Sequence, residues 1–258
     1  MASLKNKIVF VTGASAGIGQ ACARAFAASG AAILMCARRL ERIDKLAEEL
    51  QEDLGVRAHA FSLDVRDREA VEKAVEGLPG EWRAVEVLVN NAGLSRGLHK
   101  LHEGLVSDWD EMIDANVKGL LYVSRAVIPG MVARGSGHVI NIGSIAGREV
   151  YPMGNVYCAT KYAVRALSKG LRLDLNGTAV RVSEVAPGLV ETEFSLVRFH
   201  GDAERAGKVY QGYTPLRPED VAEAAVWCAT RPPHVNVAEV LIMSVDQAST
   251  TLVHKRGT

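Results

Sequence analysis

The chain has 258 residues, of which 48% are hydrophobic and 23% charged; these proportions indicate a compact soluble protein and exclude disordered, collagen-like and coiled-coil classes. Thirty Lys and Arg residues balance thirty Asp and Glu residues, so no overall field would gather nucleic acid or an anionic membrane. No apolar run approaches the roughly 18 residues of a membrane span and no signal-like apolar stretch follows the N-terminus, so we expect a cytoplasmic protein with no nucleic-acid or membrane partner.

Short β-branched or aliphatic runs alternate along the chain with stretches of helical period. Apolar residues between Leu40 and Leu50 recur at the spacing of one helix face, which predicts a helix covering a sheet. Strands joined by such helices form a parallel sheet with helices on both faces. We therefore predict one α/β domain over residues 1–258, a Rossmann-type doubly wound parallel sheet of about seven strands. The clearest strands are Ile8–Val11, Ala32–Met35, Val85–Val89, His138–Ile142 and Val180–Ser183.

A glycine-rich turn closes the first predicted strand and opens a helix, with the spacing G-x-x-x-G-x-G. Glycines let a backbone turn sharply and approach a pyrophosphate, while the free N–H groups of a helix N-terminus supply positive potential. The alternative is a turn in which the glycines serve packing alone. We expect a dinucleotide to be bound here by Gly13, Ser15, Gly17, Ile18 and Gly19.

Two arginines, Arg38 and Arg39, follow the second predicted strand. NAD-binding sheets place an acid there for the ribose 2′-hydroxyl, whereas guanidinium groups suit a 2′-phosphate. The pair therefore favours NADP(H) as the cofactor. The alternative interpretation is that both arginines are solvated residues at the start of a helix, paired with Glu41 or Glu49.

Polar residues follow the third and fourth predicted strands at the same edge of the sheet. Asp64, followed by Val65, is expected either to accept the adenine amino group or to cap a helix. The segment Asn90-Asn91-Ala92-Gly93 is expected either to organise backbone and ribose or to be a simple turn. The residues of these segments that we predict to bind the cofactor are Asp64, Val65, Asn91, Ala92 and Gly93.

The strongest indication of a reaction comes from Ser144, Tyr157 and Lys161. Tyr157 and Lys161 are four residues apart, so on a helix they share one face. A lysine cation about 5 Å from a phenol lowers the phenol pKa by roughly two units at an effective dielectric near 20, before the cost of burial. Tyr157 would then exchange a proton with an alcohol or carbonyl oxygen that Ser144 holds by a hydrogen bond, while hydride moves to or from nicotinamide.

Taken in order and spacing, these motifs resemble the short-chain dehydrogenase/reductase family over essentially the whole chain. They are the glycine loop, Asn90-Asn91-Ala92-Gly93, Asn116, Ser144, Tyr157 and Lys161. The resemblance implies that Asn116 lies in the fourth helix and holds a water linked to Lys161, and that Tyr157 and Lys161 also contact the cofactor. It further implies that the nicotinamide is bordered by Pro187, Gly188, Val190 and Thr192. The family's usual homotetramer would use the helices carrying Tyr157 and Val117 and the last strand around Leu241–Met243.

A finer likeness is to the NADP-dependent 3-hydroxy acid dehydrogenases, carried above all by the segment Thr192–Asp202. That likeness implies a small carboxylate-bearing substrate such as serine, allo-threonine or 3-hydroxypropionate, or the matching semialdehyde. Arg148 and Arg198 are then candidates to bind the carboxylate; the alternative is that each pairs with a local acid such as Glu149 or Asp202. A reductase of ketones or 3-oxoacyl thioesters, and a non-catalytic NADP-sensing module, are the competing functions.

Two further expectations concern the rest of the chain. Residues 192–218 are the least periodic stretch, rich in glycine and proline, and are predicted to form a lid over the substrate. The four cysteines are scattered without metal-binding or disulfide spacing, so we predict no metal site and reduced, buried thiols.

Overall fold

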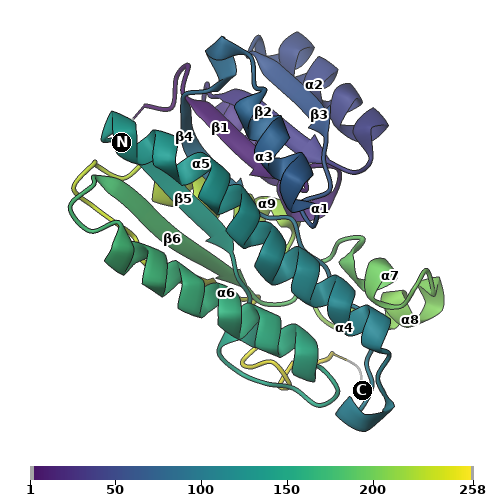
Figure 1. Cartoon of the computed structure of the whole chain (residues 1–258). Coiled ribbons are helices and arrows are strands. Elements are labelled where there is room, and N and C mark those ends of the chain that lie inside the picture. Colours follow the sequence, from purple (N-terminus) through teal and green to yellow (C-terminus); the bar gives the residue numbers. More distant parts are fainter. Residues whose placement is uncertain (1–2, 257–258) are drawn as a thin grey trace.

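The computed structural model describes residues 3–256 of the chain and has a seven-stranded parallel sheet at its centre (Figure 1). The strand order is β3-β2-β1-β4-β5-β6-β7, which confirms the predicted doubly wound sheet. Each of the five strands predicted from the sequence is present and is longer than predicted by one to four residues. The strands are β1 (Ile8–Thr12), β2 (Ala32–Ala37), β3 (Ala58–Ser62), β4 (Val85–Asn90), β5 (Gly137–Ile142), β6 (Val180–Pro187) and β7 (Glu239–Ile242).

Helices cover both faces of the sheet. On one face the apolar residues of β1, such as Val9 and Val11, pack with α1, α2 and α9; on the other, Phe10 packs with residues of α3, α5 and α6 (Figure 1). Because neither face meets water, the central strands are apolar at nearly every position. The helices are α1 (Gly17–Ala28), α2 (Leu40–Leu54), α3 (Arg68–Glu76), α4 (Val106–Ile113), α5 (Leu120–Arg134), α6 (Asn155–Asp174), α7 (Phe194–Arg198), α8 (Ala203–Lys208) and α9 (Pro218–Ala229).

The structure differs from the expectation in two local features. Asn116 lies in a π-helical segment, η3 (Asp114–Gly119), which joins α4 to α5; it is not an interior residue of an ordinary helix. The stretch 192–218 contains the short helices α7 and α8, and its last residue, Pro218, opens α9. Proline suits the first helical position because its fixed φ is already helical and its missing N–H is not needed there.

The strand order reverses between β1 and β4, and at such a point the loops leaving the carboxyl ends diverge and open a crevice. Short single-turn segments complete the chain, namely η1 (Gly80–Trp82), η2 (Leu101–Glu103) and η4 (Ile145–Gly147). Within residues 3–256, no helix combines the length and apolar character that a membrane crossing needs.

Candidate active site

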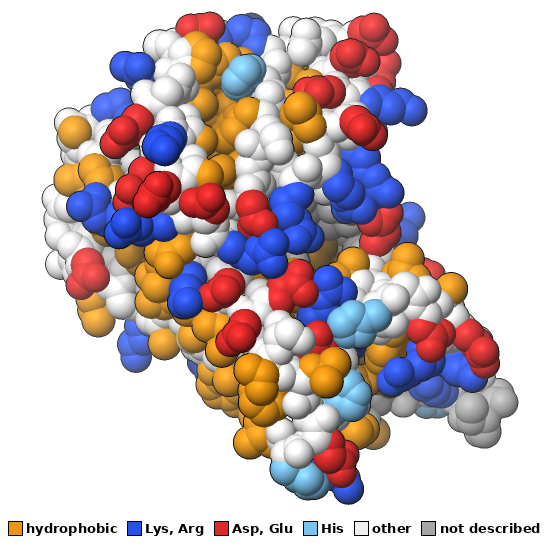
Figure 2. Space-filling view, turned by 45° about the vertical axis from the view of Figure 1, so that its right-hand side comes forward, with side chains coloured by type: hydrophobic (Ala, Val, Ile, Leu, Met, Phe, Trp, Pro, Cys, Tyr) orange, Lys and Arg blue, Asp and Glu red, His pale blue; other side chains and the backbone are white. Residues whose placement is uncertain are grey.

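A cavity of about 600 Å³ opens at the carboxyl ends of the strands, at the reversal of the strand order. Figure 2 shows a hollow bordered by basic and acidic side chains on the face that comes forward there. Most residues singled out from the sequence line this one cavity, whereas Gly19, Asn116 and Arg148 do not. Those that line it are Gly13, Ser15, Gly17, Ile18, Arg38, Arg39, Asp64, Val65, Asn91, Ala92, Gly93, Ser144, Tyr157, Lys161, Pro187, Gly188, Val190, Thr192 and Arg198.

The glycine loop has the geometry that a pyrophosphate needs. Gly13 and Gly17 have φ values of +67° and +55°, a region that favours glycine. A Cβ on Gly19 would lie 2.4 Å from both the Gly13 carbonyl oxygen and the Asn91 amide, so only glycine lets the helix start this close to the loop. The N-cap residue Ala16 offers no side chain to the first N–H groups of α1, which leaves them available to an anion. These residues fit a dinucleotide.

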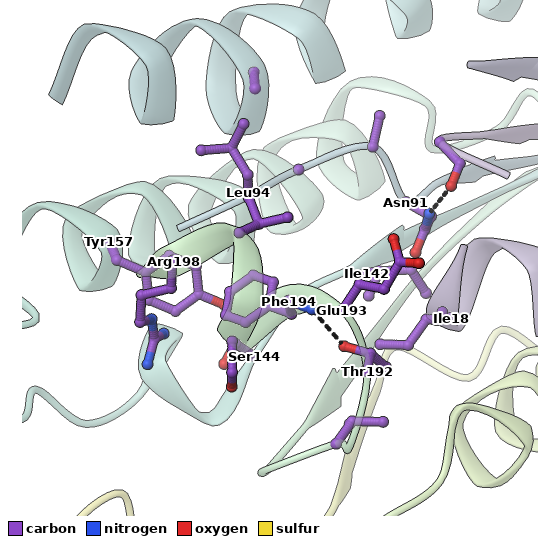
Figure 3. Close-up of a pocket in the computed structure, with 18 of the residues that line it drawn as sticks. Ile18, Asn91, Leu94, Ile142, Ser144, Tyr157, Thr192, Glu193, Phe194 and Arg198 are labelled. Atoms are coloured by element: carbon purple, nitrogen blue, oxygen red, sulfur yellow. Dashed lines mark hydrogen bonds between the residues drawn. The ribbon is translucent and has the colours of Figure 1, made fainter. Parts of the chain in front are cut away.

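Asn91 ties the fourth strand to the glycine loop. Its side-chain amide donates to the carbonyl oxygens of Thr12 (2.9 Å) and Gly13 (3.2 Å). Figure 3 draws one of these two bonds as a dashed line from Asn91. In return the Thr12 hydroxyl accepts from the backbone N–H groups of Asn91 and Ala92, both at 3.1 Å. The asparagine therefore holds the loop in shape and leaves the remaining loop N–H groups to face the cavity.

The arginines after β2 lie at the opposite end of the cavity from Tyr157. Arg39 donates to the Ser15 hydroxyl through Nε (3.2 Å) and Nη2 (3.1 Å), and it forms an ion pair with Glu193 at 2.9 Å. Arg38 is 3.9 Å from Glu111. Neither arginine pairs with Glu41 or Glu49, the acids that the alternative interpretation required. Both arginines line the cavity.

Asp64 lines the cavity and pairs with Arg66 at 2.6 Å. Partial burial raises the pKa of the Asp64 carboxyl, but the hydrogen bonds and charge of Arg66 outweigh burial and bring that pKa below its ordinary value. The helix-capping alternative belongs instead to Asp67, whose side chain accepts from Ala70 N–H at the start of α3. Asp64 is thus a charged carboxylate at neutral pH.

Tyr157, Ser144 and Arg198 meet at the other end of the cavity, as Figure 3 shows. Ser144 lies in extended backbone two residues after the end of β5, and Tyr157 comes from the first turn of α6. The Tyr157 ring makes an edge contact with Phe194, with ring centres 5.6 Å apart. The phenol, the serine hydroxyl and the guanidinium carbon, which is 5.4 Å from the Tyr157 ring centre, surround one small volume.

Burial raises the pKa of Tyr157, and the charge of Arg198 and a hydrogen bond with Ser144 oppose that rise without cancelling it. The sequence argument expected the lysine cation to lower this pKa. Lys161 Nζ lies 6.0 Å from the ring centre, on the side where it donates to the Ile142 carbonyl oxygen at 2.9 Å. Burial therefore dominates, and Tyr157 holds its proton at neutral pH, as a proton donor to a carbonyl oxygen must.

Lys161 is itself a buried cation. Burial lowers the pKa of the Lys161 ammonium from 10.5 to about 8, and the carboxylate of Glu184 acts in the opposite direction. The side chain is 8% exposed, so the charged form has lost most of its hydration. The buried charge of Lys161 therefore lowers the stability of the fold. Such a cost is common where a charged group serves catalysis.

We expect Lys161→Met to abolish turnover and to stabilise the fold at pH 7 by about 1–2 kcal/mol, because each pKa unit corresponds to about 1.4 kcal/mol and the lost hydrogen bond offsets part of the gain. The unfolded state binds more protons than the folded state between pH 8 and 10.5, so wild-type stability rises with pH there and the advantage of the variant shrinks. Urea unfolding at pH 7 and pH 10 measures both effects. A variant that is less stable at pH 7 would contradict the assigned cost of burial.

Asn116 is 2% exposed, and its side-chain amide forms hydrogen bonds within the protein. Its Oδ1 accepts from Leu94 N–H at 2.8 Å, and its Nδ2 donates to the Leu94 carbonyl oxygen (2.8 Å) and the Thr160 hydroxyl (3.0 Å). These bonds join the loop after β4 to the middle of α6, one residue from Lys161. The water expected from the family resemblance stays a prediction.

Arg198 is a buried guanidinium at the catalytic end of the cavity. It is 9% exposed, its Nε donates to Ser95 Oγ (3.1 Å), and its Nη2 donates to the Tyr151 hydroxyl (3.1 Å). Within residues 3–256 no carboxylate pairs with it, and Asp202, the acid that we considered, caps α8 instead. A buried guanidinium whose neighbours are hydroxyls and aromatic rings can still bind an anion.

Arg148 lies outside the cavity wall and pairs with two acids. Its Nη1 donates to Glu184 at 3.2 Å and its Nη2 to Glu239 at 3.0 Å; Glu149, the local acid that we considered, is not a partner. Glu184 is fully buried, and burial raises the pKa of its carboxyl against the charge of Arg148. Of the two carboxylate-binding candidates, the geometry favours Arg198.

We expect Arg148→Ala to lower the free energy of unfolding by about 3 kcal/mol at pH 8, because it leaves the Glu184 carboxylate buried without its cation. Without Arg148 the folded-state pKa of Glu184 lies further above the unfolded value, so the loss shrinks as pH falls toward 4.5. Denaturant unfolding at pH 8 and pH 5 measures this, and Arg148→Ala/Glu184→Gln serves as the compensated control. An unchanged stability together with a large rise in KM for an acid would instead put Arg148 in the substrate site.

The comparisons with known proteins agree with this geometry. The family described as short chain dehydrogenase matches residues 7–201. The chain belongs to this family. An NADP-dependent 3-hydroxy acid dehydrogenase, YdfG, of Salmonella typhimurium is 52% identical over 250 residues, which cover 96% of this chain and 99% of that protein. Sulfoacetaldehyde reductase 2 of Chromohalobacter salexigens is 46% identical, with coverage of 94% and 96%.

Among solved structures, this short-chain dehydrogenase is similar to the closed form of serine dehydrogenase complexed with NADP+. The TM-score is 0.90 at 50% identity, and the match covers 95% of this chain and 98% of that one. An alcohol dehydrogenase of Thermococcus sibiricus complexed with 5-hydroxy-NADP gives a TM-score of 0.83 at 33% identity, with coverage of 95% and 99%. The predicted membership of the family is thereby confirmed.

Several residues of the cavity wall carried no signal in the sequence of this short-chain dehydrogenase. Tyr151 contacts Arg198, Glu193 pairs with Arg39, and Gln247 accepts from Leu189 N–H at 2.8 Å next to the predicted nicotinamide segment. Each partner is 46 or more positions away in the chain, so no local spacing could reveal it. The sequence pointed toward this wall only through the segment Thr192–Asp202, which carries the finer likeness and contains Arg198.

Proposed function

We propose that this short-chain dehydrogenase oxidises a small 3-hydroxy acid with NADP and reduces the matching semialdehyde with NADPH. The single observation that carries the substrate class is the buried Arg198 guanidinium, which has no acidic partner in residues 3–256 and lies 5.4 Å from the Tyr157 ring. The chain is an NADP-dependent oxidoreductase of its family, in keeping with relatives about 50% identical over nearly their full length.

Bound NADP(H) supplies the hydride acceptor or donor at the nicotinamide. The residues of the chain bind the substrate and transfer the proton. Tyr157, whose pKa burial raises, donates its proton to the carbonyl oxygen in reduction. In oxidation the phenol first loses its proton to solvent, and the phenolate then takes the proton of the alcohol. Ser144 binds the same oxygen, Lys161 keeps a positive charge behind the phenol, and Arg198 binds the carboxylate at the far end of the short substrate.

The glycine loop and the arginines after β2 are proposed to bind the cofactor itself. Gly13 and Gly17 allow the pyrophosphate to approach the N-terminus of α1, and Arg39, already held by Ser15, presents its guanidinium to a 2′-phosphate. Asp64 is proposed for the adenine amino group, and Pro187, Gly188, Val190 and Thr192 for the nicotinamide.

The competing functions fit the cavity less well. A 3-oxoacyl thioester would extend its long apolar arm into the position of Arg198, where burying a cation against an apolar chain is unfavourable. A sensor that only binds NADP has no need of Tyr157, Ser144 and Lys161 in one volume. An anion of another shape, such as a sulfonate, would suit the same guanidinium, and the test below includes one.

Steady-state kinetics with a panel of alcohols tests the proposal. We expect 3-hydroxypropionate and serine to be oxidised with NADP+ at a kcat/KM about 100-fold above that of 3-hydroxypropanamide, the neutral match of the first, since a charged hydrogen bond contributes up to about 3 kcal/mol. The panel includes 2-hydroxyethanesulfonate as the sulfonate. Equal rates with acid and amide would overturn the substrate class, and a clear preference for the sulfonate would replace carboxylate by sulfonate.

Residues 192–218 are proposed to cover the substrate. The two ends of this segment are joined, because Val190 pairs with Leu216 in an isolated bridge and Glu191 N–H donates to the Leu216 carbonyl oxygen at 2.9 Å. A segment with joined ends can swing as one flap. Figure 1 shows α7 and α8 of this segment standing out from the body of the molecule, beside α4.

We also propose a single domain, a homotetramer and a cytoplasmic location. One sheet with both faces covered supports the single domain. Exposed apolar side chains on the expected contact elements support assembly; they are Leu121, Leu173 and Leu241. All four cysteines are buried free thiols, which fits a reducing compartment.

A further inference from the structure

A carboxylate of the proposed lid occupies the arginines at the adenosine end of the cavity. Glu193, which precedes α7, pairs through Oε2 with Arg39 (2.9 Å) and through Oε1 with Arg42 (2.8 Å). Both arginines belong to the start of α2. Each oxygen of the carboxylate therefore serves one guanidinium, and the ion pair with Arg39 joins two residues that both line the cavity.

Three of the five N–H groups of Arg39 already have an acceptor while this contact exists. Its Nε and Nη2 donate to Ser15 Oγ and its Nη1 to Glu193. The hydrogen bonds and charges of Arg42 and Arg39 lower the pKa of the Glu193 carboxyl, so Glu193 is an anion throughout the neutral range. A 2′-phosphate, which carries negative charge and needs the same donors, has to take them from Glu193 or share them with it.

We propose that Glu193 is an internal competitor of the cofactor's 2′-phosphate for Arg39. This inference rests on the proposed function, because it takes Arg39 as the residue that binds the 2′-phosphate. The carboxylate lowers affinity for NADP(H) and leaves affinity for NAD(H) unchanged, since NAD(H) has no group that requires the contested guanidinium. Glu193 therefore sets how strongly the enzyme prefers NADP(H).

The exposure of the three side chains sets the size of the effect. Glu193 is 41% exposed, Arg39 48% and Arg42 49%. Ion pairs this exposed are weak and screened by salt, so the competitor changes affinity by a small factor and does not block the site. When the 2′-phosphate displaces the Glu193 carboxylate from Arg39, that carboxylate keeps Arg42 as its partner.

Glu193→Gln tests the competition, because it keeps the shape of the side chain and removes its charge. The probes are adenosine 2′,5′-bisphosphate, which carries the 2′-phosphate without the nicotinamide, and adenosine 5′-monophosphate, which lacks it. We expect the Kd of the bisphosphate and of NADPH to fall about fivefold by calorimetry, while the Kd of the monophosphate and of NADH stay within twofold. The matched control is Glu191→Gln, an exposed acid two residues away without an ion pair in residues 3–256.

The outcomes separate the two proposals. A bisphosphate Kd that is unchanged or weaker in Glu193→Gln would overturn the competition, as would an equal gain in Glu191→Gln, which would show a general charge effect. If the wild-type protein binds NADPH no more tightly than NADH, the assignment of Arg39 to the 2′-phosphate fails, whatever the variants do. A gain in affinity that is confined to Glu193→Gln and to ligands with a 2′-phosphate supports the competition.

Discussion

Replacing Tyr157 with phenylalanine is expected to lower kcat by about 10³-fold in both directions, while the Kd for NADPH stays within about twofold of wild type. General acid–base groups contribute about 10²–10⁴-fold to rate, and this substitution removes the only hydroxyl that we assign to proton transfer. The ring remains, so its edge contact with Phe194 and its place beside Arg198 are kept. Stopped-flow turnover and fluorescence titration of NADPH measure the two quantities separately.

The matched control for this experiment is Tyr162→Phe. Tyr162 lies on the same helix, α6, is exposed, and donates its hydroxyl to the Arg148 carbonyl oxygen, outside the cavity. We expect its turnover to remain near wild type. Turnover above about a tenth of wild type in Tyr157→Phe would show that another group moves the proton and would remove Tyr157 from the mechanism.

Arg198→Met is expected to raise KM for 3-hydroxy acids by about 100-fold, because the substrate carboxylate loses a charge-assisted hydrogen bond in a buried site. A second effect is expected on kcat in the oxidative direction. The Arg198 charge opposes the rise that burial causes in the Tyr157 pKa, so its removal makes the phenol a weaker acid. That loss falls equally on acidic and neutral alcohols.

The ratio of kcat/KM for 3-hydroxypropionate to that for 3-hydroxypropanamide separates these two effects. We expect the ratio to fall about 100-fold in Arg198→Met and to stay unchanged in Arg205→Met. Arg205 is the control because it lies on α8 of the same segment, stacks on Phe199 at 4.4 Å and does not line the cavity. An unchanged ratio in Arg198→Met would show that this guanidinium does not recognise the carboxylate.

The fold was predictable because its causes are local and periodic. The apolar runs at Ile8–Val11 and Val85–Val89 are strands that need cover on both faces, and the Leu40–Leu50 pattern supplies one of the covering helices. Family membership followed from glycine, serine, tyrosine and lysine positions whose spacing survives in the sequence. Most of the predicted site residues line one cavity; their individual roles stay predictions.

What the sequence did not contain are the contacts made across the cavity and the balance of burial against charge. Glu193 and Arg39 are 154 positions apart, and Arg198 and Ser95 are 103 apart, so no pattern in one segment indicates the other. The raised pKa of Tyr157 depends on how much of the ring and its neighbours is covered, which spacing along a helix cannot give. The Coulomb argument from Lys161 left out the cost of burial, and in the structure burial has the larger effect on the Tyr157 pKa.

The central claim is that hydride passes between the hydroxyl-bearing carbon of a 3-hydroxy acid and NADP under the control of Tyr157. The most direct measurement uses 3-hydroxypropionate deuterated at its hydroxyl-bearing carbon, mixed with NADP+ and the wild-type enzyme or Tyr157→Phe. We predict that mass spectrometry finds one deuterium in each NADPH formed by the wild type, and almost no NADPH with the variant. Unlabelled NADPH from the wild type, or no NADPH at all, would contradict the account.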